Sequence, residues 1–143
     1  MSKTVFDNIL SKVSVRPQNI GAATVNGIAV DTKGFANLMA VAEVGAAEGS
    51  PSAQTFNAKL QEADTSGGSY TDITGAAITE ITADDKSAQI QLLGLGTGTL
   101  KRFVRIVVVT TLTGGSTPKI EVAGIILLGQ AHNKAVGNSI AGA

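Results

Sequence analysis

The segment from Gly94 to Gly98, which reads Gly-Leu-Gly-Thr-Gly, has the glycine content of a phosphate-binding loop. In a GxGxxG pattern that starts at Gly94, the third glycine position falls on Thr99. The segment after it has the composition of a strand, so no helix N-terminus would meet a phosphate. We therefore expect a turn here and no nucleotide site.

The adjacent carboxylates Asp84 and Asp85 could hold a calcium ion together with Asp64 or Asp72. Calcium takes roughly six to eight oxygen ligands, and the sequence has no acidic loop with EF-hand spacing. We expect a surface turn at this point and no metal site.

Covalent catalysis has few candidate residues. His132 is the single histidine, and the chain has no cysteine. One histidine cannot form a histidine-rich metal site, and no GxSxG nucleophile elbow supports a Ser–His–Asp triad. Tyr70, in a Ser-Tyr-Thr-Asp loop, is the single tyrosine and makes no sugar-binding platform alone. The sequence thus predicts a protein that is not an enzyme and has no cofactor.

The amino-acid composition further narrows the class of protein. The 143 residues fit one domain with an aliphatic core, since hydrophobic residues make up 43% and aromatic residues 3%. The 11 basic and 11 acidic side chains balance, which argues against nucleic acid as the main partner. No apolar run approaches the roughly 20 residues of a membrane helix, and the N-terminus does not read as a signal peptide.

The elements that must position any site are strands. Residues 101–129 contain two β-branched runs around a Gly/Ser/Thr/Pro turn, which predicts a hairpin. One face of each run should line the core, through Val104, Ile106, Val108, Leu112, Ile120, Val122, Ile126 and Leu128. The opposite faces are also apolar, with Val107, Val109, Ile125 and Leu127. We expect the chain's own arm or another subunit to cover them.

Alternating patterns recur at residues 35–44, 55–62 and 87–93, separated by turns, and predict seven or eight strands in all. The predicted fold is all-β, an antiparallel β-sandwich of jelly-roll type with a barrel-like alternative. We expect residues 21–129 to form this domain and residues 130–143 to be a C-terminal extension.

Residues 1–20 are predicted to be an N-terminal arm. Phe6, Ile9, Leu10 and Val13 lie at i, i+3, i+4 and i+7, the stripe of a short helix. Such a helix would pack on its own domain or dock on a neighbouring protein. On the docking interpretation, deleting residues 1–15 leaves a folded domain that binds its partner weakly.

Three parts of the chain together resemble small virion proteins of tailed bacteriophages. They are residues 30–35, residues 56–62 with 66–72, and residues 101–106. In those proteins a strand ending in a Leu-Gln-Glu-like sequence precedes an Asp/Gly/Ser loop with Tyr or Trp. A later strand begins Lys-Arg-Phe/Tyr-Val-Arg. The resemblance implies a β-rich head protein that decorates or cements a capsid, and it transfers no binding residue.

The leading hypothesis is a structural protein on the capsid surface of the virion, assembled in the host cytoplasm. Its expected partners are the major capsid protein and further copies of itself, with a trimer favoured by analogy with shell symmetry. No membrane and no direct nucleic-acid contact are expected. A tail, neck or head-fibre component and a carbohydrate-binding module of the host surface are the alternatives. The predicted contact residues are Phe6, Ile9, Leu10, Val13, Val107, Val109, Ile125 and Leu127.

Overall fold

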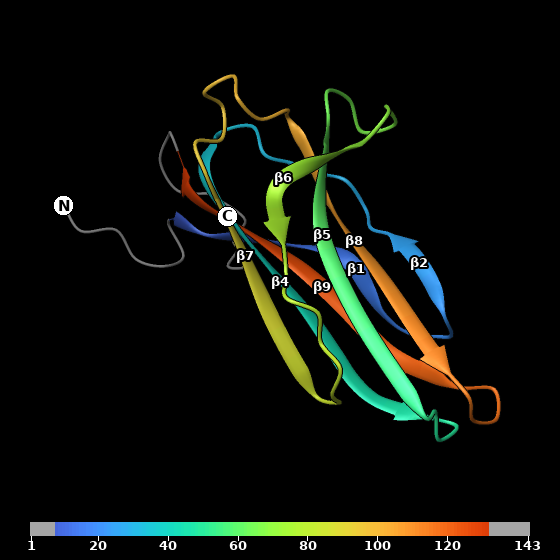
Figure 1. The fold of residues 1–143 in the computed structure, drawn as a ribbon. Coiled ribbons are helices and arrows are strands. Elements are labelled where there is room, and N and C mark those ends of the chain that lie inside the picture. Colours follow the sequence, from blue (N-terminus) through green and yellow to red (C-terminus); the bar gives the residue numbers. More distant parts are fainter. Residues whose placement is uncertain (1–7, 132–143) are drawn as a thin grey trace, which may run out of the picture.

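The computed structural model describes residues 8–131, and the strands of this part account for most of it (Figure 1). Residues 9–131 contain no helix. No helix in the described part is long and apolar enough to cross a membrane. The strands are β1 (Leu10–Ile20), β2 (Ala23–Asn26), β3 (Val30–Asp31), β4 (Phe35–Glu48), β5 (Ala53–Ala63), β6 (Thr71–Ala77), β7 (Lys86–Leu93), β8 (Phe103–Thr113) and β9 (Lys119–Ala131).

Two antiparallel sheets lie face to face (Figure 1). The four-stranded sheet has the order β1-β9-β4-β7, and the five-stranded sheet has the order β2-β8-β5-β6, with β3 also paired to β8. Consecutive strands mostly change sheets: β1 to β2, β3 to β4, β4 to β5, β6 to β7, β7 to β8 and β8 to β9. This arrangement is a jelly roll, and it confirms the all-β sandwich predicted from the alternating patterns.

The core lies between the two sheets and is aliphatic apart from phenylalanine. The inward row of β4 consists of Leu38, Ala40, Ala42 and Val44, all buried. Phe56 and Leu60 of β5 are 1% and 0% exposed. The predicted core rows of β8 and β9 are confirmed for Val104, Ile106, Val108, Ile120, Val122, Ile126 and Leu128, which are buried. Leu112 of the same predicted row is partly buried and packs against the core.

The predicted hairpin between β8 and β9 is wrong. The two strands lie in different sheets, and residues 114–118 carry the chain from one sheet to the other. Both strands have one strongly apolar face, and stacking those faces across the core buries them as well as side-by-side pairing would. The turn glycines Gly114 and Gly115 adopt φ of 71° and 74°, a region that glycine occupies without strain.

The short helix predicted from the stripe of Phe6, Ile9, Leu10 and Val13 is wrong over residues 9–13. Leu10–Ile20 forms β1, which pairs antiparallel with β9, so this part of the predicted arm is a strand of the sandwich. A helix of about 11 residues is marginal on its own, whereas the edge of β9 offers a row of backbone partners. Phe6 lies outside the described residues.

Ser14 closes the sandwich where β1 and β8 approach. Its hydroxyl donates to the carbonyl oxygen of Ile28 at 3.0 Å and accepts from the backbone N–H of Ile106 at 2.9 Å. The backbone of Ser14 also accepts from the N–H of Ile28 at 2.6 Å. Gly27 donates its N–H to the Ile106 carbonyl at 2.8 Å. One buried hydroxyl therefore joins an edge strand of one sheet to a central strand of the other.

Candidate interaction surface

The outer side of the four-stranded sheet carries an apolar patch that crosses β1, β9 and β4. Val13, Ile125 and Val41 are successive cross-strand neighbours, and Leu127 pairs with Met39 in the next row. Leu93 of β7 and Ile9 before β1 extend the patch. We call this set the apolar face: Ile9, Val13, Met39, Val41, Leu93, Ile125 and Leu127.

Several members of the apolar face are well exposed. Leu93 is 74% exposed, Val13 47%, Ile9 41% and Ile125 36%. Next to them is a hollow of about 240 Å³, lined by Ile9, Asn37, Leu38, Met39, Gln91, Leu93, Leu127, Leu128 and Gly129. Contiguous apolar surface of this kind is typical of a contact with another molecule.

The structure brings together Ile9, Val13, Ile125 and Leu127 from the predicted contact residues. Leu10 does not join them, because its strand neighbour is the buried Leu128 and its side chain packs against the core. The helical stripe placed Leu10 and Val13 on one side, whereas in a strand they lie on opposite sides.

Val107 and Val109 lie on the other sheet. Val107 is 2% exposed, with Asn26 of β2 and Lys59 of β5 as its cross-strand neighbours. The chain therefore covers Val107 by itself, and the residue is not free to contact a partner. Val109 is half-buried between Thr24 and Asn57.

The outer side of the five-stranded sheet is polar and internally bonded. Asp72 accepts from Lys59 at 2.7 Å and from Gln61 at 2.8 Å, and these hydrogen bonds lower the pKa of its carboxyl below the usual value. Arg105 donates to Gln61 at 2.7 Å and stacks its guanidinium over the Tyr70 ring, 4.0 Å from the centroid.

Three separate segments, residues 30–35, 56–72 and 101–106, meet at the start of β8. Besides the contacts of Arg105 and Asp72, Glu62 accepts from the backbone N–H of Lys101 at 2.8 Å. Asp31 accepts two hydrogen bonds from Arg102, at 2.8 and 2.7 Å, and the first cause of its lowered pKa is this contact. These contacts tie the β5–β6 loop and the turn after β3 to the start of β8.

The glycine loop at residues 94–98 is a turn, as predicted. Leu95 is buried and donates its backbone N–H to Ala36 at 2.9 Å, and Thr97 donates its hydroxyl to the Gly94 carbonyl at 2.6 Å. The loop is followed by β8, a strand.

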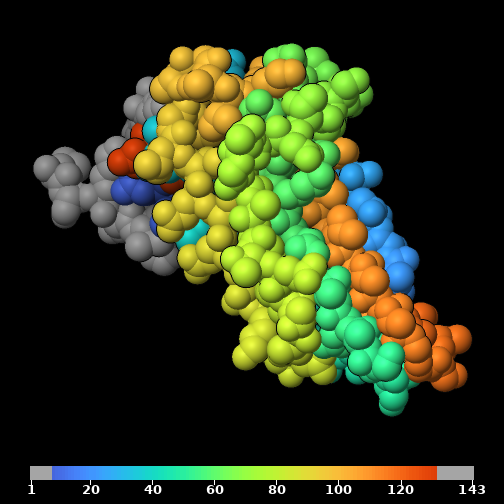
Figure 2. All heavy atoms as spheres, viewed as in Figure 1, coloured from blue at the N-terminus to red at the C-terminus, as the bar shows by residue number. Residues whose placement is uncertain are grey.

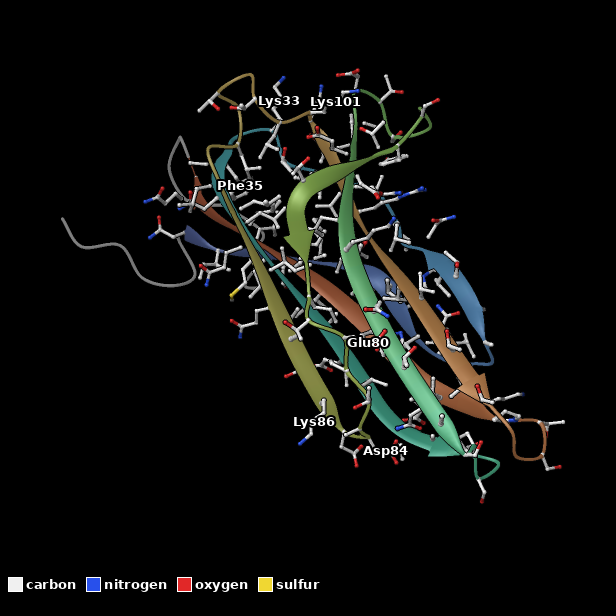
Figure 3. All side chains as sticks on the ribbon, in the orientation of Figure 1. Lys33, Phe35, Glu80, Asp84, Lys86 and Lys101 are labelled. Atoms are coloured by element: carbon white, nitrogen blue, oxygen red, sulfur yellow. The ribbon has the colours of Figure 1, made fainter. Side chains whose placement is uncertain are left out.

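The acidic candidates do not converge. Asp84 accepts from the Ala47 N–H at 3.2 Å and from Gln54 at 2.5 Å, so it ties the ends of β4 and β5 together. Asp64 pairs instead with Lys101, which Figure 3 places at the opposite end of the sandwich from Asp84. Within residues 8–131 no group of three or more His, Cys, Asp or Glu side chains could hold a metal ion. His132 lies outside the described residues.

Sequence reasoning missed Met39, Val41 and Leu93 as members of the apolar face. The signal was present, because Met39 and Val41 occupy the row of β4 opposite the buried one, where an exposed strand would carry polar residues.

No family model matches the chain, and no curated protein matches it. Three solved structures have a backbone that is similar to that of this chain. The first is described as "Bacillus endospore appendages form a novel family of disulfide-linked pili", with 15% identity, a TM-score of 0.41, and coverage of 92% of this chain and 98% of the other. A family two carbohydrate esterase from Cellvibrio japonicus has 12% identity and a TM-score of 0.38, with coverage of 87% and 32%. Desmodium yellow mottle tymovirus has 10% identity and a TM-score of 0.37, with coverage of 96% and 95%. Because each TM-score is below 0.5, none of these likenesses bears on the function of this chain.

Proposed function

We propose that this protein is a structural component of a tailed-bacteriophage virion that decorates or cements the capsid. In this proposal the apolar face docks on the lattice of the major capsid protein. The protein has no enzymatic role and sits on the capsid surface after assembly in the host cytoplasm.

The apolar face is the observation that carries the docking role. Its aliphatic side chains form neighbouring rows on one sheet, while the other sheet turns a bonded polar network outward. Burying a fully exposed aliphatic side chain stabilises a complex by roughly 1.5–3 kcal/mol before ordering costs. An oligomer that engages several copies of one lattice surface at once binds more tightly than a single contact would, so modest contacts per chain suffice. The three segments that resemble small virion proteins support the choice of a virion.

The test is occupancy of undecorated capsids by the purified protein. Val13→Gln combined with Ile125→Gln places two amides on neighbouring strands at the centre of the apolar face. Both positions are exposed, so folding should be retained. We expect binding to weaken at least tenfold, about 1.4 kcal/mol, measured by co-sedimentation over a range of protein concentrations.

The matched control is Thr24→Gln combined with Thr111→Gln. These exposed positions lie on an edge strand and a central strand of the other sheet. The control should bind as the wild type does. Equal occupancy by the apolar-face variant would rule out docking through this face, and a wild-type protein that binds no capsid would refute the virion role.

A further inference from the structure

The two sheets of residues 8–131 have four edges, and an edge strand presents backbone N–H and C=O groups to which another strand can pair. β1 and β7 border the four-stranded sheet, whereas β6 borders the five-stranded sheet on one side and β2 with the two-residue β3 on the other. The four edges differ in how well they are protected.

Three of these edges are interrupted. β1 contains Pro17 and two register shifts, at Val13/Val15 and Val15/Gln18, and Ile28 already occupies the Ser14 carbonyl. β2 has 4 residues. β6 contains Gly75 with φ 79°, and its register against β5 shifts between Lys59 and Gln61. Prolines, bulges and short length are the usual means of preventing strand addition.

The edge of β7 has none of these features. Its 8 residues pair with β4 in one unbroken register, from Asn37↔Leu93 to Val44↔Lys86. The strand has no proline, and its single charged residue is Lys86 at the start. Figure 1 shows no described strand beyond it, and Figure 2 shows its yellow atoms at the surface of that view.

We propose that β7 pairs antiparallel with β7 of a second copy of this chain, which joins two four-stranded sheets into one continuous sheet. In the register we assign, Ile90 faces Ile90 of the second copy. The proposal rests on the backbone edge and is independent of the virion role.

This register suits a second copy of the same strand. Gln89 faces Gln91 of the other copy, and Leu93, which is 74% exposed, faces Ser87 and is covered. No like charges are opposed, because Lys86 falls beyond the paired segment. The extended backbone ends at Asp85 (φ 54°) on one side and Gly94 (φ 78°) on the other, so residues 87–93 match in length.

The contact is isologous, since the same strand serves on both sides, and it closes at two copies. It therefore favours a dimer over the trimer expected from shell symmetry. The apolar faces of the two copies become parts of one broad sheet surface, because Leu93 borders the joined edge.

The proposal is tested in the full chain by introducing charged residues of one sign, and then of the opposite sign, on the β7 edge. Gln89→Lys combined with Gln91→Lys opposes like charges twice across the twofold axis. We expect a dimeric wild type, a dissociation constant at least about tenfold higher for this variant, and recovery when it is mixed with the Gln89→Glu and Gln91→Glu chain. Mass is measured by sedimentation, and circular dichroism checks that each variant is folded.

The control pair, Thr71→Lys with Thr74→Lys, places two lysines on the exposed β6 edge and should leave the dimer intact. A wild type that stays monomeric at all accessible concentrations overturns the proposal. So does an assembly with an odd number of chains, or a dimer that is indifferent to charge at residues 89 and 91. Pairing of β7 with another segment of the same chain would give the monomeric result.

Discussion

At the scale of single residues, closure of the sandwich depends on Ser14 and Gly27. The Ser14 hydroxyl is buried, and both of its hydrogen bonds reach backbone groups of other elements. Gly27 lies so close to these groups that a Cβ added to it would be 2.5 Å from the Ile106 carbonyl oxygen and 2.5 Å from Ser14 Oγ. The missing side chain is what lets three segments meet here.

Gly27→Ala should therefore destabilise the fold. The methyl group must push either the β8 backbone or Ser14 aside, and overpacking of this kind costs about 1–3 kcal/mol. We expect the urea midpoint to fall with an unchanged slope. Gly67→Ala is the control, since nothing lies within 4 Å of its added Cβ, and it should unfold like the wild type. An unchanged midpoint for Gly27→Ala would show that this contact is looser than the structure indicates.

At the scale of elements, β1 is the clearest revision of the sequence-based interpretation. Its outward residue Val13 belongs to the apolar face, whereas Val15 is 1% exposed and part of the core. The same strand thus contributes both to folding and to the candidate docking surface. Removing β1 would therefore affect the stability of the fold as well as the candidate docking surface.

Deletion of residues 1–15 should abolish cooperative folding. The deletion removes half of β1 and both Ser14 and Val15, so it uncovers the edge of β9. Thermal unfolding followed by circular dichroism would show a broad transition or none. Deletion of residues 1–7 is the control, because every contact among residues 8–131 stays in place. A sharp wild-type-like transition in the longer deletion would restore the independent-arm interpretation.

At the scale of the whole molecule, the sheets join distant parts of the chain. Leu10 pairs opposite Leu128, and Val25 opposite Val108. The two outer faces also differ in chemistry, one apolar and one polar. The proposed assembly is therefore directional, with the four-stranded sheet turned toward the capsid.

The non-local pairing predicts slow folding. Sandwiches dominated by such contacts fold in about milliseconds to seconds, because loop-closure entropy must be lost before the pairing stabilises the chain. Stopped-flow refolding from urea should show a dominant phase in that range. A microsecond phase that recovers the full native signal would contradict the topology described here.

The fold class and the buried rows of several strands could be predicted from the amino-acid pattern alone. The alternation in β4, β5 and β9 identifies the core positions, because side chains on a strand point to opposite faces in turn. It also indicated that Ile125 and Leu127 are apolar on a second face. It also placed the turn at residues 94–98 correctly, because closely spaced glycines favour a turn.

The pairing of the strands, and the grouping of apolar residues on one surface, became evident only from the three-dimensional arrangement of the chain. Periodicity reports the face on which a strand is buried, but the backbone edge is chemically the same for every partner. The sequence therefore could not distinguish a β8–β9 hairpin from two strands stacked in opposite sheets. It could not separate Val107, covered by its own sheet, from Val13, exposed on the other. Nor could local spacing show that Leu10–Ile20 forms a strand. That strand is stabilised by pairing with β9, whose residues lie a hundred or more positions further along the chain.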